Sequence, residues 1–470
     1  MKTTLHFLLA LCSLFLVAPI VAQTTVRLET PPCRGRMQVF AMHGAGYYKM
    51  ANIKTIRQQD TLSTQPELKL EEKHVFTWQA PDTEPSIYYL GTSMRDYIPI
   101  VVGQDPIVEI KGQCGQLGRS TISTSPGNVA YQKMLKQLGE NNNYFAQLNQ
   151  KYRSALAAKD EGAQKNEAAK MAELDTKKRA LVDSLKKTNP FLGRIAAVNT
   201  YLSFQGSQDS PYRNELEHYV NTYWQFTDFT DQGYNGMNAV YESTVAYTNT
   251  LASALDATQM GEILNAYFAR WPSGSEAKLY AMGGAFGVLS QRGHAAALPI
   301  GEALVSEFKA DYPLPIGAVE QSFNKLRTSV QGAEAPNLVG NSPTGEEHTL
   351  ADLRGKVVLI DFWASWCGPC RRENPNVKRI YNKYADQGFE ILGVSLDRSK
   401  DRWEKAIADD ELTWLHISDL KHWKSEHARL YGVRSIPETV LLDQEGRIIA
   451  RGLQGAQLEQ RLAQIFGEGK

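Results

Sequence analysis

Asp361-Phe362-Trp363-Ala364-Ser365-Trp366-Cys367-Gly368-Pro369-Cys370 is the stretch that decides the fold and the chemistry. The apolar run 357–362 that enters it is typical of a buried strand, and the pattern from Cys370 to Tyr384 favours a helix. Two cysteines separated by two residues at a strand-to-helix junction can close a small disulfide ring. The unpaired amides and the dipole of the helix N-terminus favour a thiolate at Cys367. We therefore expect a reactive Cys367 with a lowered pKa and a partly exposed sulfur, and a buried Cys370 that resolves the mixed disulfide.

Charged and metal-binding residues near this pair leave other interpretations open. Arg371 and Arg372 are expected to add positive charge on the next helical turn. A zinc site would need two more ligands, and the nearby His416, His422 and His427 do not form a recognisable ligand pair. A purely structural disulfide and a copper-delivery site are further alternatives. We expect no metal and no cofactor.

The chain around the pair alternates between strand and helix from about residue 329 onward. The expected strands are 357–362, 390–396, 439–442 and 448–451. The expected helices are 370–384, 400–409, 423–431 and 458–466. This alternation predicts an α/β domain over residues 329–470.

The ten-residue stretch resembles the active site of thioredoxin, and the resemblance extends over residues 329–470. It implies a central mixed sheet flanked by helices, with Cys367 as the attacking thiol and Cys370 as the resolving one. Asp361 matches the buried acid of that family. Because burial raises the pKa of a carboxyl group, Asp361 could exchange a proton with Cys370 near neutral pH. The alternative for Asp361 is an ordinary carboxylate at a strand end.

The segment 434–438, Arg-Ser-Ile-Pro-Glu, precedes the strand at 439–442. The resemblance implies that Pro437 is cis and faces the cysteines, and that the backbone of Ile436 pairs with an extended substrate chain. It also implies that Trp366 forms a rim for substrate. The family often has Thr after this proline, where this chain has Glu438. A trans-proline loop is the alternative.

Glu373, together with residues 332–338 and 350–356, resembles the periplasmic reductases of the TlpA and ResA kind. In some of these proteins the acid at this position tunes the active-site thiols, so the resemblance implies a second proton acceptor. The alternative is a residue on the helix surface. Pro375 also matches that family, where it kinks the active-site helix.

The residues before the α/β domain divide into two expected domains. Short apolar runs separated by turn residues predict a small β-sandwich over residues 23–118, of a kind that resembles the β domain preceding many secreted thioredoxin-like domains. Cys33 and Cys114 stand at its two ends, and we expect them to form a structural disulfide rather than two buried free thiols.

Residues 119–328 show helical periodicity and predict an α-helical domain. A turn at 159–162 would give an antiparallel hairpin that ends at Asn189-Pro190, although a single long helix is an alternative. The glycine-rich run 281–287 lacks the Lys-Ser/Thr pair of a phosphate loop, so close helix packing is the better interpretation.

The N-terminal residues 1–22 resemble a cleaved secretory signal, with Lys2, an apolar stretch and small residues before Gln23. A single membrane anchor is the alternative. The 51 basic and 51 acidic side chains balance, which makes nucleic acid an unexpected partner. We expect a periplasmic location.

These features together predict an exported thiol-disulfide oxidoreductase that reduces disulfides of other exported proteins and receives electrons from a membrane thiol reductase. A thiol peroxidase is an alternative, but Ala364 and the second cysteine depart from the Pro, Thr and lone cysteine which that activity expects. A third hypothesis is a non-enzymatic envelope protein whose residues 23–327 bind a partner and whose redox domain is accessory.

Overall fold

The computed structural model describes most of the chain: residues 23–33, 36–43, 46–52, 55–59, 72–82, 84–93, 95–207 and 210–467. The expected signal segment 1–22 lies outside the described residues. Within these ranges, every helix is too short or too polar to cross a lipid bilayer.

The chain forms two compact units. The first contains residues 1–42 and 47–227, and the second contains residues 43–46 and 228–470. The helical segment 119–328 is therefore divided between the two units near residue 227.

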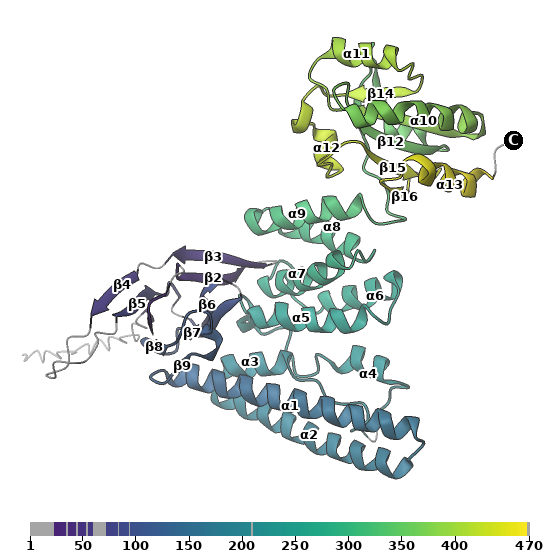
Figure 1. The fold of residues 1–470 in the computed structure, drawn as a ribbon. Coiled ribbons are helices and arrows are strands. Elements are labelled where there is room, and N and C mark those ends of the chain that lie inside the picture. The colour runs from purple at the N-terminus through teal and green to yellow at the C-terminus, as the bar shows by residue number, and fades with distance from the viewer. Residues whose placement is uncertain are drawn as a thin grey trace, which may run out of the picture. The chain divides into compact units, whose positions relative to one another are not determined.

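The first unit begins with two β-sheets (Figure 1). One has the strand order β4-β5-β1-β8-β9 and the other β3-β2-β6-β7. The strands are β1 (Thr25–Thr30), β2 (Gln38–His43), β3 (Gly46–Asn52), β4 (Thr55–Gln59), β5 (Glu72–Gln79), β6 (Ser86–Ser93), β7 (Asp96–Val102), β8 (Ile107–Lys111) and β9 (Thr121–Ile122). The apolar runs at 26–28, 75–78, 87–90, 98–102 and 107–110 fall in β1, β5, β6, β7 and β8, and the run at 37–42 overlaps β2. The sequence did not predict β3, β4 and β9.

A disulfide joins Cys33 to Cys114, with 5.8 Å between the Cα atoms. Both cysteines are half-buried and pack against the apolar core that includes Val26, Leu28 and Ile110. This bond closes a loop of 81 residues around the sheets.

The helical part of the first unit is a hairpin followed by two shorter helices. The helices are α1 (Pro126–Ala157), α2 (Glu161–Thr188), α3 (Pro190–Val198) and α4 (Glu215–Thr222). Lys159 has a φ of 56°, and the Asp160 side chain caps α2 by accepting from the Ala163 amide, so the chain turns there. The single long helix is therefore excluded. Asn189 ends α2 and caps α3.

The second unit opens with five helices: α5 (Asn238–Leu251), α6 (Ala257–Phe268), α7 (Glu276–Gln291), α8 (Ala297–Phe308) and α9 (Pro313–Arg327). The glycine-rich run lies inside α7. A Cβ built on Gly284 would lie 2.8 Å from the Tyr241 carbonyl oxygen on α5. The glycine thus permits close approach of α5 and α7, as expected from the sequence.

The residues after α9 contain a seven-stranded mixed sheet with the order β11-β10-β14-β13-β12-β15-β16, which is the α/β layout expected from the sequence (Figure 1). The strands are β10 (Val339–Asn341), β11 (Glu347–Thr349), β12 (Val357–Trp363), β13 (Phe389–Ser395), β14 (Leu415–Ser418), β15 (Glu438–Leu442) and β16 (Ile448–Arg451). The helices are α10 (Gly368–Tyr384), α11 (Lys400–Asp409), α12 (Glu426–Leu430) and α13 (Gly455–Phe466).

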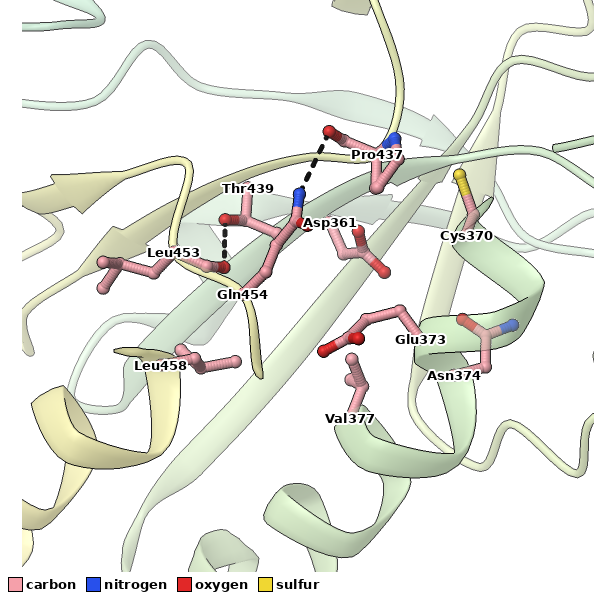
Figure 2. A pocket seen from close by; sticks show the side chains of 10 residues that line it. All are labelled: Asp361, Cys370, Glu373, Asn374, Val377, Pro437, Thr439, Leu453, Gln454 and Leu458. Atoms are coloured by element: carbon pink, nitrogen blue, oxygen red, sulfur yellow. Dashed lines mark hydrogen bonds between the residues drawn. The ribbon is translucent and has the colours of Figure 1, made fainter. Parts of the chain in front are cut away.

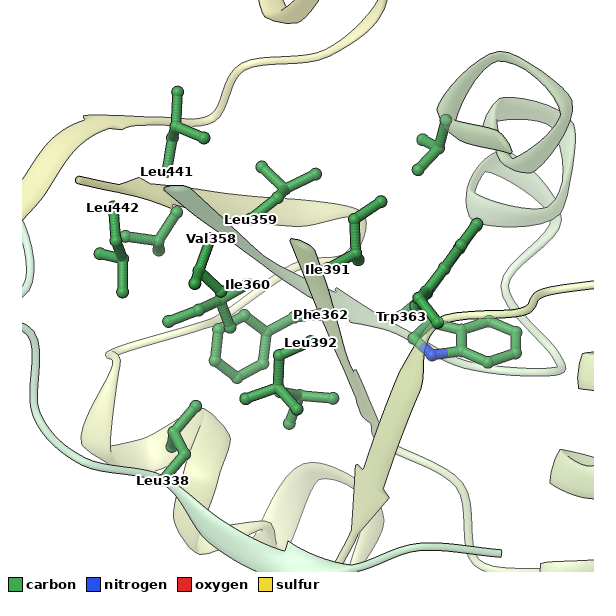
Figure 3. Packing of buried hydrophobic residues seen from close by; sticks show 14 of the residues in the cluster. Leu338, Val358, Leu359, Ile360, Phe362, Trp363, Ile391, Leu392, Leu441 and Leu442 are labelled. Carbon is green, nitrogen blue, oxygen red and sulfur yellow. The ribbon is translucent and has the colours of Figure 1, made fainter. Parts of the chain in front are cut away.

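Strand β12 is the central strand, parallel to β13 and antiparallel to β15. All seven of its residues are buried, because helices cover both faces of the sheet it belongs to. Its apolar side chains form the core with neighbours such as Leu338, Ile391 and Leu441 (Figure 3). This packing fixes the end of β12, where the chain turns into the cysteine pair.

Candidate active site

Cys367 and Cys370 form a disulfide at the start of α10, with 5.3 Å between the Cα atoms. Cys367 is the N-cap of the helix, and its sulfur accepts a hydrogen bond from the Cys370 amide at 3.2 Å. The donor is one of the helix amides that lack a backbone partner. A negative charge on the Cys367 sulfur would therefore be stabilised after the disulfide opens.

The structure corrects one expectation for this pair. Cys370 is buried as predicted, but Cys367 is 4 % exposed rather than partly exposed. The structure holds the oxidised form, in which the bond to Cys370 draws the Cys367 sulfur against the helix.

Asp361 lies on β12 beneath the cysteine pair and is 6 % exposed. It lines a narrow pocket of about 10 Å³ together with Cys370 and Glu373 (Figure 2). Burial, together with the smaller effect of the negative charge of Glu373, raises the pKa of Asp361 to about 7. The pocket volume is at the lower limit of the space that one water molecule needs.

Glu373 points into the same pocket and is half-buried, not a free surface residue (Figure 2). Its Oε1 accepts from the Gly455 amide at 2.9 Å and from the Asn376 side chain at 2.8 Å. Gly455 is the first residue of α13, so a helix N-terminus holds this carboxylate in place.

The peptide bond between Ile436 and Pro437 is cis, and Pro437 lines the pocket beside Cys370. Ile436 is half-buried and packs against the core. The Pro437 carbonyl accepts from Gln454 at 3.3 Å (Figure 2). Residues 454 and 455 therefore connect the cis-proline segment to Glu373.

Glu438 follows the cis-proline, and its carboxylate accepts from Arg451 at 2.7 Å. The acid that replaces the family's usual Thr is thus balanced by a cation on the neighbouring strand β16.

The arginines after the pair do not behave alike. Arg371 makes two hydrogen bonds of 2.6 Å to Asp410, so a neighbouring carboxylate offsets the positive charge that it was expected to add. Asp410 lies just past α11 and also accepts from Asn374. Arg372 remains exposed, and one of its guanidinium nitrogens lies 3.3 Å from the position that a Cβ on Gly368 would take.

Asp397 was missed by the sequence analysis, although it holds the loop that carries the pair. It is 1 % exposed and accepts from the Ser365 amide at 2.9 Å and the Ser365 hydroxyl at 2.5 Å. Ser395 donates to the same carboxylate at 2.8 Å. Its position just beyond β13, parallel to β12, was the available signal, because parallel strands end at the same sheet edge.

Trp366 is 46 % exposed and stands beside Cys367. Its ring lies 4.9 Å from the ring of His422 and 6.2 Å from that of Trp423, centroid to centroid. Trp423 is 44 % exposed. Trp363, in contrast, is 1 % exposed and packs in the core.

The three histidines considered as metal ligands have different surroundings. His416 is buried between Trp363 and Trp414, where burial lowers its pKa to about 3. His427 is hydrogen-bonded to the Val339 carbonyl, and His422 belongs to the aromatic group at the surface. In the part of the chain that the structure describes, no three His, Cys, Asp or Glu side chains gather closely enough to hold a metal.

A cysteine pair at a helix N-terminus, a buried acid below it and a cis-proline beside it define a thioredoxin-like redox domain. A family model described as the AhpC/TSA family matches residues 331–451. The thiol-disulfide oxidoreductase ResA of Geobacillus thermodenitrificans is 38% identical over 126 residues, which cover 27% of this chain and 71% of that protein.

ResA of Bacillus cereus is 30% identical over 144 residues, covering 31% of this chain and 81% of the relative. The thioredoxin domain of a thiol-disulfide oxidoreductase from Bacteroides vulgatus, a solved structure, is 35% identical, with 29% of this chain and 97% of that chain covered and a TM-score of 0.28. The chain belongs to the thiol-disulfide oxidoreductase family that includes ResA. It is an oxidoreductase.

Proposed function

We propose that this enzyme is exported to the periplasm and reduces disulfides in other exported proteins through Cys367 and Cys370. The observation that carries this proposal is the cysteine pair at the N-terminus of α10, directly above a buried acid whose pKa lies near 7. A membrane thiol reductase would return the enzyme to its dithiol form. Residues 1–22 would direct export and be removed, and residues 23–118, 119–328 and 329–470 would be its three domains.

The reaction begins when the Cys367 thiolate attacks one sulfur of the client disulfide. The client bond breaks, a mixed disulfide forms with Cys367, and the departing client sulfur takes up a proton. Trp366, Ile436 and Pro437 would hold the client chain, with the Ile436 backbone pairing as an added strand.

The second exchange requires Cys370 to lose its proton. Asp361 and Glu373 line the same pocket as Cys370, so either carboxylate could accept that proton. The Cys370 thiolate then attacks Cys367, the mixed disulfide breaks, and the second client thiol leaves. Two electrons have moved from the enzyme dithiol to the client.

Trapping in living cells tests this proposal. The Cys370→Ala variant cannot resolve the mixed disulfide, so it should accumulate covalent complexes with exported proteins that dissolve on reduction. The matched variant Cys367→Ala, which keeps the buried cysteine alone, should capture none. A wild-type pair that no dithiol reduces, or equal capture by both variants, would contradict the proposed function.

A further inference from the structure

The cationic side chains of residues 329–467 divide into two groups. Most are engaged with a carboxylate, a side-chain amide or a backbone carbonyl: Arg354, Lys356, Arg371, Lys378, Arg379, Lys383, Lys400, Lys405, Lys421, Arg447, Arg451 and Arg461. The others have no such hydrogen bond or ion pair with any residue that the structure describes: Arg372, Arg398, Arg402, Lys424, Arg429 and Arg434.

Four cations of the second group are close in the sequence to residues that form or hold the site. Arg372 follows the cysteine pair and reaches back over Gly368. Arg398 comes directly after Asp397, which binds the loop before Cys367. Lys424 follows Trp423, and Arg434 stands three residues before the cis-proline. All four are exposed, and we call them the rim cations.

The carboxylates in the same segments are mostly engaged. Asp397 is buried under Ser365, and Asp419 accepts from the amides of Lys421 and Glu426. Glu438 is paired with Arg451. Asp401, in the first turn of α11, is exposed and forms no ion pair with any residue that the structure describes. Asp397 and Asp419 keep their negative charges, because their partners are amides and hydroxyls and not cations. Among the exposed side chains of these segments that have no ion pair, the four rim cations outnumber Asp401, in a chain whose total charge is zero.

An apolar surface lies among these cations. Trp366 and Trp423 are two of the large apolar side chains that the described part of this domain leaves exposed, the others being Val339 and Ile465. With His422 between them they form a continuous ring surface next to Cys367, which we call the aromatic shelf. Exposed aromatic groups of this kind are frequent anchors in protein interfaces.

We propose, on the basis of the proposed function, that the aromatic shelf and the rim cations select client segments in which an acidic residue and an apolar ring flank the disulfide. The ring stacks on Trp366 and Trp423, while the acidic side chains lie among the rim cations. Positive charge around the site also speeds the approach of such segments. Basic segments are disfavoured by the same charges.

Three disulfide-bridged peptides test the proposal. They share one phenylalanine and differ only in the flanking residues, which are glutamate, serine or lysine. The probe is the release of a quenched fluorophore by the full-length protein, reduced beforehand with dithiothreitol. At low salt the glutamate peptide should have a kcat/KM roughly tenfold above that of the lysine peptide, and the difference should shrink at about 1 M salt.

Charge reversal gives the matched control. The double variant Lys424→Glu and Arg434→Glu should remove or invert the preference, whereas Arg461→Glu, further along α13, should leave it unchanged. Trp423→Ala should raise KM for the phenylalanine peptides with little change in kcat. The melting temperature of each variant shows whether it is folded.

The outcomes separate the two proposals. If even the serine peptide is not reduced, the proposed function fails. If the serine peptide is reduced but the glutamate and lysine peptides are reduced equally at low salt, the proposed function stands and the selection of acidic clients is wrong.

Discussion

The same covalent bond occurs twice in this chain, in two different settings. Cys33 and Cys114 close a loop of 81 residues, whereas Cys367 and Cys370 are three residues apart. In the chain-entropy model the long loop contributes about 4.5 kcal/mol to stability and the short one only about 1.6 kcal/mol. A small ring that stabilises little is suited to repeated opening, and the long loop is suited to remaining closed.

The surroundings of the two disulfides also suit one bond to remaining closed and the other to opening. The Cys33–Cys114 bond packs on the apolar core of the sheets. The Cys367–Cys370 bond lies at a helix N-terminus, with Asp361 and Glu373 in the pocket below. Sequence spacing and the carboxyl groups below the bond, and not the bond itself, separate the reactive disulfide from the structural one.

The largest expected effect is the loss of Cys367. Cys367→Ser should reduce dithiothreitol-driven insulin reduction by about 10³-fold or more, because the serine hydroxyl is not a thiolate at neutral pH. The turbidity of precipitating insulin chains measures the rate. Retention of more than a tenth of the activity would show that another group is the nucleophile.

The next effect concerns Asp361, the buried acid below the Cys367–Cys370 bond. Asp361→Asn should slow resolution of a mixed disulfide by about 10²-fold, since general-base assistance contributes about that much. In the wild type the resolution rate should rise with pH up to about 7 as Asp361 ionises, and the variant should lose this rise. Stopped-flow tryptophan fluorescence of the oxidation step measures both.

Ionisation of Asp361 should speed the resolution step but lower the stability of the folded protein. The folded-state pKa of about 7 lies above the value of 3.8 for a free carboxyl group. Stability is therefore greatest below pH 4 for this group and falls by up to about 4 kcal/mol as pH rises to 7. Asp361→Asn should be more stable than the wild type at pH 7.5 in urea unfolding; equal stability at pH 4 and pH 7.5 in both proteins would contradict the buried ionisable acid.

The Cys33–Cys114 bond should matter for stability alone. Replacing both cysteines with alanine should lower the unfolding free energy of the first unit by about 2 to 4 kcal/mol. Insulin reduction by the folded variant should be unchanged. A tenfold loss of activity would erase the distinction between the two disulfides.

The smallest effect is expected at Gln454, which ties the Pro437 carbonyl to the start of α13. Gln454→Ala removes one exposed hydrogen bond, so KM for a peptide disulfide should rise about threefold with kcat nearly unchanged. Gln460→Ala on the same helix is the matched control. Equal KM values for the two variants would show that Gln454 does not position the cis-proline segment.

Features that depend on local pattern were predictable from the sequence. The apolar run 357–362 lies within β12, and the cysteine pair lies at the helix start as expected. The turn at Lys159 and the helix boundary at Asn189 also follow from local capping residues. In each case the determining residues are close together in the chain.

Features that depend on distant partners were not predictable. Arg371 is neutralised by Asp410, 39 residues away, and the loop before Cys367 is held by Asp397. Strand β14 has only four residues, including His416 and Ser418, which gives no clear alternation. Strands β3 and β4 also lack a clear alternation of apolar and polar residues, because both contain several polar residues. These elements form because neighbouring strands pair with them, which a single segment does not reveal.

The catalytic role of the pair depends on the reactivity of the Cys367 sulfur at the N-terminus of α10, and the pH dependence of its alkylation measures that reactivity. The Cys370→Ala variant, reduced and treated with iodoacetamide, carries Cys367 as its free thiol next to the helix. The midpoint should lie clearly below the value of about 8.5 for an ordinary cysteine, because the helix N-terminus stabilises the thiolate. A midpoint at or above about 8.5 would contradict it.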